Sequence, residues 1–289
     1  MKTETTTKKT LKTAGLQPIK GLGQNFLIDK SVLKRVVEAA DLKPEETVIE
    51  IGPGLGALTQ ELAKRVKKVI AVEKDQKMVE TLKNTLKEFK NVEIVQGDIL
   101  KIPHTKYKIP DTKYKVVANL PYYITSPVIR KFLESGNPPE EMVLMVQKEV
   151  AQRICATPPD MSLLATSVQF YAAPKIISFV SKKSFWPKPK VDSAIIRMIP
   201  INKFAWAHSH SARPKSRASA FRILFFKIVK AGFSQPRKQI LNNLSNGLKL
   251  NKDTVKSWLL KNNIQPEQRA ETLSIEDWAK LAKTCGYNL

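Results

Sequence analysis

Cysteine and histidine are scarce in this sequence, with two cysteines and three histidines among 289 residues. Cys155 and Cys285 lie far apart in the chain, and neither falls in a metal-ligand spacing. A disulfide between them is one possibility, and two buried thiols in a reducing compartment are the alternative that we favour. His208 and His210 have no third candidate ligand near them in the sequence, so we expect no metal cofactor.

Long apolar runs are absent as well. No segment approaches the ~18 consecutive apolar residues of a membrane span, so we expect no membrane association. Residues 1–20 are polar and rich in lysine, without the apolar stretch of a secretory signal or the arginines of a mitochondrial presequence. The sequence therefore predicts a cytoplasmic protein that begins with a flexible basic tail over residues 1–20.

Acidic residues are few, with 26 Asp and Glu against 49 Lys and Arg, which gives a net charge of +23. Residues 193–252 contain twelve Lys and Arg and no acid, whereas residues 253–289 contain five of each sign. Because soluble surfaces normally mix charges, this segment indicates a surface that binds phosphates, with Arg222, Arg237 and Lys238 as candidate RNA contacts. An acidic protein or an anionic membrane surface would also suit this charge.

The spacing of apolar residues along the chain changes near residue 201. Before that point, short and mostly continuous apolar runs alternate with helical stretches, which is typical of strands buried in a largely parallel sheet. The predicted strands are 47–51, 69–73, 92–96, 114–119, 142–147, 176–180 and 192–199. After it, helical spacing dominates. We predict a doubly wound α/β domain over residues 21–201, followed by a small all-helical domain over residues 202–289.

The first predicted strand runs into "EIGPGLGALT", where glycines allow a tight turn at the start of a helix. Gly52 and Gly54 open this turn, Glu73 closes the next strand, and Asp98 follows the third. Carboxyl ends of parallel strands share one edge of a sheet, where such acids can hold a ribose and a base. An NAD site or a simple packing turn would also use glycines. The three features together resemble those of S-adenosylmethionine-dependent methyltransferases.

The segment "NLPYYIT" over residues 119–125 places an amide and aromatic rings at the end of a strand. A catalytic carboxylate is unnecessary for an exocyclic adenine amine, which needs hydrogen-bond acceptors that localise the nitrogen lone pair. The Asn119 side-chain oxygen and the Leu120 carbonyl can serve as these acceptors, because Pro121 fixes the turn. The Tyr122 ring offers a stacking surface for the base, worth ~1–3 kcal/mol. A strand end followed by a helix cap is the purely structural alternative.

Six motifs occur in the order of a known family. They are "GQNFLID", "IEIGPGLGALT", "VEKD", "GDIL", "NLPYYIT" and "FWPKPKVDSAIIRM". With them the chain resembles the KsgA-type ribosomal RNA adenine dimethyltransferases from about Gly21 to Leu281. The resemblance implies that S-adenosylmethionine is bound by Asn25, Leu27, Gly52, Gly54, Glu73, Asp98 and Asn119. It also implies that residues 119–122 form the catalytic loop and that Phe185 stacks on the target base opposite Tyr122.

The same resemblance implies dimethylation of two adjacent adenosines in the 3′-terminal hairpin of 16S rRNA, by a monomer acting on the small ribosomal subunit during its biogenesis. Segments 156–165 and 205–219 depart from the family pattern, which affects RNA contacts rather than the chemistry. One alternative is a related methylase of large-subunit rRNA, whose catalytic asparagine is usually followed by isoleucine, where this chain has Leu120. The other is an RNA-binding assembly factor without turnover, which would be expected to have a decayed cofactor pocket.

Overall fold

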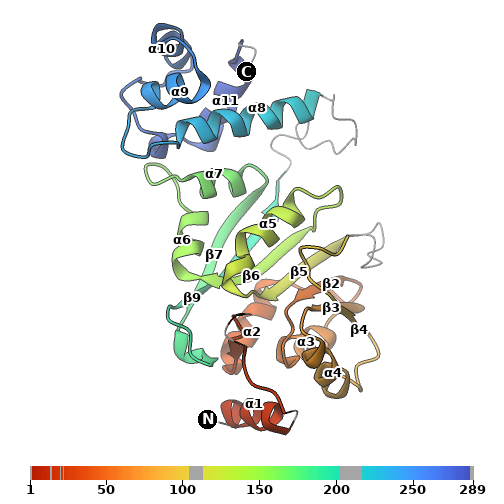
Figure 1. Cartoon of the computed structure of the whole chain (residues 1–289). Helices are drawn as coiled ribbons and strands as arrows, with labels where there is room; N and C mark the ends of the chain where they lie inside the picture. Colours follow the sequence, from red (N-terminus) through yellow and green to blue (C-terminus); the bar gives the residue numbers. More distant parts are fainter. Residues whose placement is uncertain are drawn as a thin grey trace. The chain divides into compact units, whose positions relative to one another are not determined.

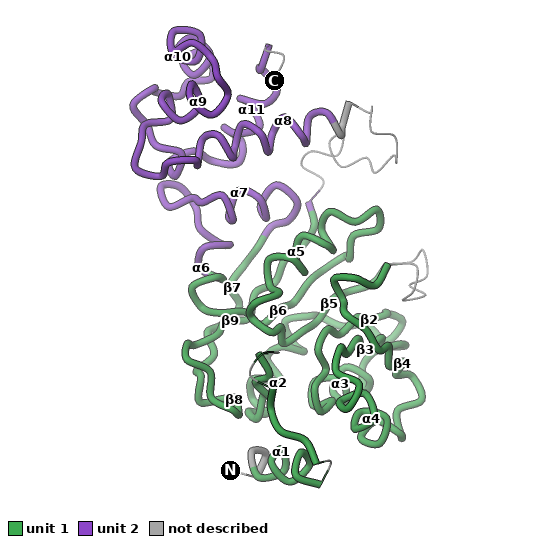
Figure 2. The backbone as a smooth tube through the Cα atoms, in the orientation of Figure 1, with its two compact units in different colours: residues 1–151, 174–200 green, residues 152–173, 201–289 purple. Residues whose placement is uncertain are grey.

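The computed structural model describes residues 2–13, 15–19, 21, 23–103, 113–201 and 217–286. It divides into two compact units, one of residues 1–151 and 174–200 and the other of residues 152–173 and 201–289 (Figure 2). The sequence places a single boundary after residue 201, whereas in the structure residues 152–173 belong with the helical unit. The chain thus leaves the first unit and returns to it before the final helices begin.

One sheet in the first unit has seven strands in the order β4-β3-β2-β5-β6-β9-β7 (Figure 1). The strands from β4 to β6 are parallel, and β9 runs antiparallel to β6. Their bounds are β2 Thr47–Ile51, β3 Lys68–Glu73, β4 Val92–Gln96, β5 Tyr114–Asn119, β6 Glu141–Gln147, β7 Ala172–Val180 and β9 Ser193–Pro200. These confirm the seven predicted strands, although β7 begins earlier than predicted.

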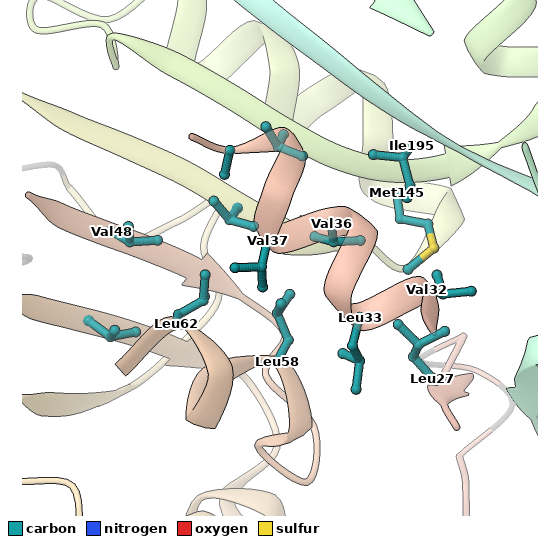
Figure 3. Close-up of a cluster of buried hydrophobic side chains, with 14 of the residues drawn as sticks. Leu27, Val32, Leu33, Val36, Val37, Val48, Leu58, Leu62, Met145 and Ile195 are labelled. Atoms are coloured by element: carbon teal, nitrogen blue, oxygen red, sulfur yellow. The ribbon is translucent and has the colours of Figure 1, made fainter. Parts of the chain in front are cut away.

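Helices cover both faces of the sheet, as a doubly wound fold requires. Helices α2 (Lys30–Ala39) and α3 (Ala57–Ala63) pack on one face, where Val117 of β5 joins their buried side chains in a common cluster (Figure 3). Tyr114 points to the opposite face, because successive strand residues alternate. There its ring lies 6.5 Å from Phe132 of α5 (Thr125–Leu133).

The remaining elements of the first unit are short. A second sheet pairs β1 with β8 and aligns Phe26 with Trp186. These two strands are β1 Phe26–Leu27 and β8 Phe185–Trp186. The other α-helices that begin in this unit are α1 Lys2–Thr13, α4 Gln76–Thr85 and α6 Lys148–Ile154. Its 3₁₀ helices span Tyr122–Ile124 and Lys182–Ser184. No described helix is long and apolar enough to cross a membrane.

Residues 2–13 form helix α1, where the sequence predicts a flexible tail. Leu11 of this helix is buried against Phe26 and Met78. The Lys8 ammonium lies 5.5 Å from the centre of the Trp186 ring. Because isolated helices of this length are marginal in water, these tertiary contacts account for the helix where sequence composition indicates none.

The second unit is helical, and aromatic rings form much of its core. Phe170 contacts Phe225 with ring centres 4.4 Å apart, and Phe233 contacts Trp278 at 5.5 Å. Its helices are α7 Leu163–Gln169, α8 Arg217–Gly232, α9 Ile240–Leu248, α10 Lys252–Lys261 and α11 Ile275–Thr284, with a 3₁₀ helix over Ala270–Thr272. Ser274 and Asp277 form a capping box at the start of α11.

A lysine in the middle of the first unit's sheet interrupts the apolar run of β5. The Lys115 ammonium donates to the carbonyls of Ala40 and Asp41, at 2.8 and 2.7 Å, where helix α2 ends. It also lies 3.2 Å from a Glu46 carboxylate oxygen and 3.3 Å from one of Glu141. Since all three ionic side chains are nearly buried, this lysine neutralises carboxylates that water cannot reach and anchors α2 to the sheet.

We expect Lys115→Met to lower the free energy of unfolding by about 3–5 kcal/mol, because it leaves two buried carboxylates without this partner. Lys113→Met is the matched control, since Lys113 pairs with Glu140 at 2.9 Å but its side chain is 82% exposed. That control should cost far less, because exposed ion pairs contribute little to stability. Urea denaturation followed by circular dichroism measures both. Equal losses for the two variants would show that the buried network does not stabilise the sheet.

Candidate functional site

A cavity lies at the edge of the sheet where the parallel strands β2, β3, β4 and β5 have their carboxyl ends. Every residue predicted to bind a cofactor lines this cavity, namely Asn25, Leu27, Gly52, Gly54, Glu73, Asp98 and Asn119. The predicted loop residues Leu120, Pro121 and Tyr122 line it too, and so does Thr7 of α1. Open α/β sheets bind ligands at this edge, because loops from neighbouring strands converge there.

The turn after β2 has a backbone conformation that favours glycine. Gly52 and Gly54 have φ values of 67° and 59°, in the left-handed region. A Cβ atom on Gly54 would also stand 3.2 Å from ring atoms of Phe26, closer than most real contacts. The two glycines therefore let the main chain turn at the cavity and enter α3, as the sequence predicts.

Glu73 and Asp98 present carboxylates from neighbouring strands. The Glu73 Oε1 accepts from the amides of Lys74 and Asp75, at 2.8 and 2.9 Å, which fixes its orientation, and burial raises the pKa of this carboxyl. Burial also acts to raise the pKa of Asp98, but the Leu100 amide and the Lys74 ammonium outweigh it and hold that pKa below its usual value. Both acids thus remain fixed acceptors beside the cavity.

Glu50 is a third acid at the cavity, and the sequence analysis missed it. Its side chain is 2% exposed, and its Oε2 has no hydrogen-bond partner within the described ranges. Burial raises the pKa of Glu50 to about 8, and the nearby Glu73 carboxylate acts in the same direction. Its sequence signal is an acid inside the otherwise apolar strand that precedes Gly52. A buried acceptor without a partner suits a ligand that brings hydrogen-bond donors or positive charge.

The Asn119 amide is oriented by a backbone carbonyl. Its Nδ2 donates to the carbonyl of Asn25 at 3.1 Å, and the Asn25 Nδ2 donates in turn to the carbonyl of Gly23 at 3.1 Å. Because a carbonyl can only accept, the hydrogen bond assigns nitrogen to the position beside Asn25. The Asn119 Oδ1 is consequently left as an acceptor at the end of β5, beside the cavity.

The loop after Asn119 holds a tyrosine ring at the cavity. Pro121 has the extended backbone that its ring favours, and a 3₁₀ turn follows it. The Tyr122 hydroxyl forms a 2.8 Å hydrogen bond with the Ser193 hydroxyl of β9, and burial raises the pKa of Tyr122. Ser193 therefore fixes the ring from another strand. The turn runs directly into α5, whose N-cap is Ile124.

Phe185, which the family resemblance predicts to stack on the target base opposite Tyr122, is buried in this structure. Its side chain is 3% exposed and belongs to the hydrophobic cluster under α2, and it does not line the cavity. Pairing of β8 with β1 sets it opposite Leu27 and draws it inward. Tyr123, which the sequence analysis did not single out, lines the cavity and is 56% exposed.

The three candidate RNA contacts all lie in the second unit but do not form one cluster. Arg222 is on α8, whereas Arg237 and Lys238 follow the end of that helix and are exposed. Arg222 stands ten residues before the end of α8, about 15 Å along its axis. They would therefore contact separate phosphates. His208, His210 and most of the 205–219 segment lie outside the described residues.

A metal site was not expected from the sequence. Across the described ranges, no group of three or more His, Cys, Asp or Glu side chains could hold a metal ion.

Comparison with known proteins identifies similar sequences and structures. Residues 17–286 match the ribosomal RNA adenine dimethylase family. A ribosomal RNA small subunit methyltransferase A from Dehalococcoides mccartyi is 46% identical over 266 residues, covering 92% of this chain and 88% of the relative. One of the same name from Anoxybacillus flavithermus is 42% identical over 290 residues, covering 97% and 95%.

Two solved structures are similar over most of the chain. The 23S rRNA methyltransferase ErmE has a TM-score of 0.70 and 26% identity, and the match covers 90% of this chain and 98% of ErmE. A dimethyladenosine transferase from Plasmodium falciparum has a TM-score of 0.69 and 27% identity, with 88% and 94% covered. The fold of the chain is therefore that of Rossmann-like rRNA methyltransferases with a helical C-terminal region.

The buried Glu50 predicts a pH dependence of stability. Its pKa is about 8 in the folded protein and ordinarily 4.5, so folding favours the protonated form. The free energy of unfolding should fall as pH rises from about 4.5 to about 8, because the folded state then binds more protons than the unfolded state. Glu50→Gln should flatten this decline and be more stable than wild type above about pH 8. Thermal melts across this range measure the effect.

Glu61→Gln is the control for this experiment. Glu61 lies on the solvent side of α3, where hydrogen bonding from Lys64 and then Arg65 lowers its pKa despite partial burial. Its contribution to stability is present above its unfolded pKa and is lost as pH falls, the opposite sign to that of Glu50. The control should therefore retain the decline toward pH 8. Parallel curves for Glu50→Gln and wild type would contradict the assigned protonation.

Proposed function

Because the chain belongs to the ribosomal RNA adenine dimethylase family, whose members are S-adenosylmethionine-dependent rRNA methyltransferases, we propose a specific substrate for it. It transfers four methyl groups to the N6 atoms of two adjacent adenosines in the 3′-terminal hairpin of 16S rRNA. The reaction takes place on the small ribosomal subunit, in the cytoplasm, as a step of subunit biogenesis, and the protein acts as a monomer.

The observation that carries this proposal is the orientation of Asn119. With its nitrogen bound to the Asn25 carbonyl, its oxygen accepts a hydrogen bond from the adenine amine. The Leu120 carbonyl is proposed as the second acceptor. Two acceptors on the N–H groups localise the nitrogen lone pair, which the adenine ring otherwise withdraws. The Tyr122 ring, held through Ser193, supplies the stacking surface. Phe185 lies in the hydrophobic cluster, so stacking is assigned to Tyr122 alone.

The cavity residues fit S-adenosylmethionine as the methyl donor. This cofactor carries a positive sulfonium and a positive ammonium, and the buried Glu50 oxygen without a partner suits a cationic group. Glu73 is proposed to hold the ribose hydroxyls, Asp98 the adenine amine of the cofactor, and the turn at Gly52 and Gly54 its methionine part. Asn25 and Leu27 complete the pocket. When bound, the cofactor supplies a methyl group that its sulfonium has already activated.

The transfer itself requires positioning more than proton removal. S-adenosylmethionine held by the cavity residues would supply the methyl group, and the adenine amine held by Asn119 and Leu120 would receive it. The nitrogen then loses a proton to water. Asn119 holds the amine before the transfer, and Tyr122 limits the motion of the base. Such orientation accounts for much of the catalysis when the leaving group is neutral.

A large-subunit substrate is the alternative, since ErmE is named for 23S rRNA. Sequence identity supports the small subunit, because the D. mccartyi relative is 46% identical and ErmE 26%. Leu120 after the catalytic asparagine supports it as well. The decisive test is methyl transfer from labelled S-adenosylmethionine to unmethylated small and large subunits. We expect N6,N6-dimethyladenosine in 16S rRNA only. Label in 23S rRNA alone, or none with the wild-type protein, would overturn the proposal.

The second unit is proposed to bind rRNA phosphates through Arg222, Arg237 and Lys238. Replacing all three by Gln should weaken subunit binding and lower the slope of log affinity against log salt by ~0.7–0.9 per lost contact. Affinity for S-adenosylmethionine should not change, because its cavity is lined by the first unit only. Equilibrium titrations at several salt concentrations measure the slope. If these residues only cover a helical surface, the slope will stay constant and the melting temperature will fall instead.

A further inference from the structure

The outer strand of the sheet carries exposed apolar and basic side chains that the proposed chemistry does not use. Strand β7 forms the end of the seven-stranded sheet. Lys175, Ile177 and Phe179 alternate along it, so they share one face, and all three are exposed. Phe179 is 50% exposed and Ile177 38%. Ile177 and Phe179 together expose apolar surface on one face of this strand, and their surroundings indicate which kind of partner would fit it.

The surroundings of Phe179 are strongly basic. Residues 174–191 contain five lysines and no acid. The Lys148 ammonium lies 5.1 Å from the centre of the Phe179 ring, and an Arg35 guanidinium nitrogen donates to the Phe179 carbonyl at 3.3 Å. We name Lys148, Lys175, Phe179, Lys182 and Lys183 the edge patch. Within the part of the chain that the structure describes, none of its lysines forms an ion pair.

Three acids lie near the edge patch, and in the described part of the chain none forms an ion pair with its lysines. The first, Asp29, accepts from the Ser184 hydroxyl at 2.9 Å. Asp192 uses a carboxylate oxygen to accept from the Lys182 amide at 2.9 Å, and its carbonyl accepts from the Lys148 amide at 3.0 Å. Glu149 follows Lys148 on α6 and is exposed. An excess of cations beside a half-exposed aromatic ring is the combination that binds single-stranded nucleic acid, with phosphates on the cations and a base on the ring.

The edge patch is continuous with the catalytic loop. Ser193, which holds the Tyr122 hydroxyl at 2.8 Å, directly follows Asp192. Gln147 pairs with Ser193 across β6 and β9, and Lys148 comes next in the chain. Tyr122 is hydrogen-bonded to Ser193 of β9. The residue before Ser193, Asp192, is hydrogen-bonded to the backbone amides of Lys148 and Lys182. The backbone next to the residue that holds Tyr122 therefore also carries lysines of the edge patch, which connects the proposed adenine site with this edge.

We propose that the edge patch is a subsite for nucleotides flanking the target adenosine, with one base stacked on Phe179 and the backbone phosphates held by Lys148, Lys175, Lys182 and Lys183. The inference rests on the proposed function, because it assumes an RNA strand whose target adenosine is bound at Tyr122. A second copy of the chain is a poor occupant for this edge, since like-charged lysines on two edge strands would repel each other.

The test measures equilibrium binding of the full chain to naked 16S rRNA and to unmethylated small subunits. Phe179→Leu keeps an apolar side chain and removes the ring, and Phe179→Tyr keeps the ring. We expect Phe179→Leu to raise Kd for both RNAs about tenfold, the value of one stacked base, and Phe179→Tyr to bind like wild type. Lys148→Gln with Lys175→Gln should lower the salt slope by ~1.4–1.8.

Lys83→Gln with Lys87→Gln is the matched control, because these exposed lysines lie on and after α4, which packs beside β4 at the opposite end of the sheet. It should leave Kd and slope unchanged. Melting temperature and S-adenosylmethionine affinity, expected to be unchanged in every variant, confirm folding. The inference would be overturned if the patch variants had the Kd and the salt slope of the wild type. It would also be overturned if they bound subunits more weakly but naked rRNA equally well, because that result indicates a ribosomal protein as the partner. Absence of methyl transfer by the wild-type protein would instead refute the proposed function.

Discussion

The hydrogen bond from the Asn119 Nδ2 to the Asn25 carbonyl connects the two segments on which the site depends. It is 3.1 Å long and joins the end of β5 to the chain just before β1. Pairing of β1 with β8 holds that segment in place, with Phe26 opposite Trp186. The Phe26 ring in turn packs against Gly54, where a Cβ atom would stand only 3.2 Å from the ring atoms. Without this hydrogen bond the Asn119 amide could rotate, and its oxygen would no longer be held in one position beside the cavity.

Charge is divided within the chain in a way that suits two different ligands. The chain as a whole carries a net charge of +23, yet Glu50, Glu73 and Asp98 meet at one cavity from three neighbouring strands. Because its pKa is lowered, Asp98 keeps its negative charge near neutral pH, which suits the cationic methyl donor that we propose for this cavity. Lys74 also lines the cavity and pairs with Asp98 at 3.1 Å, whereas the lysines of the edge patch and the described basic residues of the second unit do not line it.

The sequence was sufficient for the features that depend on local pattern. Continuous apolar runs located the strands, and an acid at the end of a strand located Glu73 and Asp98. Features that depend on contacts between distant segments could not be predicted in this way. Lys115 lies inside an apolar run, and only the fold brings Glu46 and Glu141 to it. Ser193 meets Tyr122 across the sheet, and pairing of β8 with β1 buries Phe185 despite its motif.

The central claim is that Asn119 acts through its oxygen because its nitrogen is bound to Asn25. Asn119→Asp tests this directly, since aspartate keeps an oxygen toward the adenine amine but sets a second acceptor against the Asn25 carbonyl. The measurement is the single-turnover rate of methyl transfer to small-subunit rRNA, with cofactor affinity and melting temperature as controls. The account predicts a rate about 100-fold below wild type, because a hydrogen bond is replaced by two facing acceptors. A rate within a few-fold of wild type would contradict it.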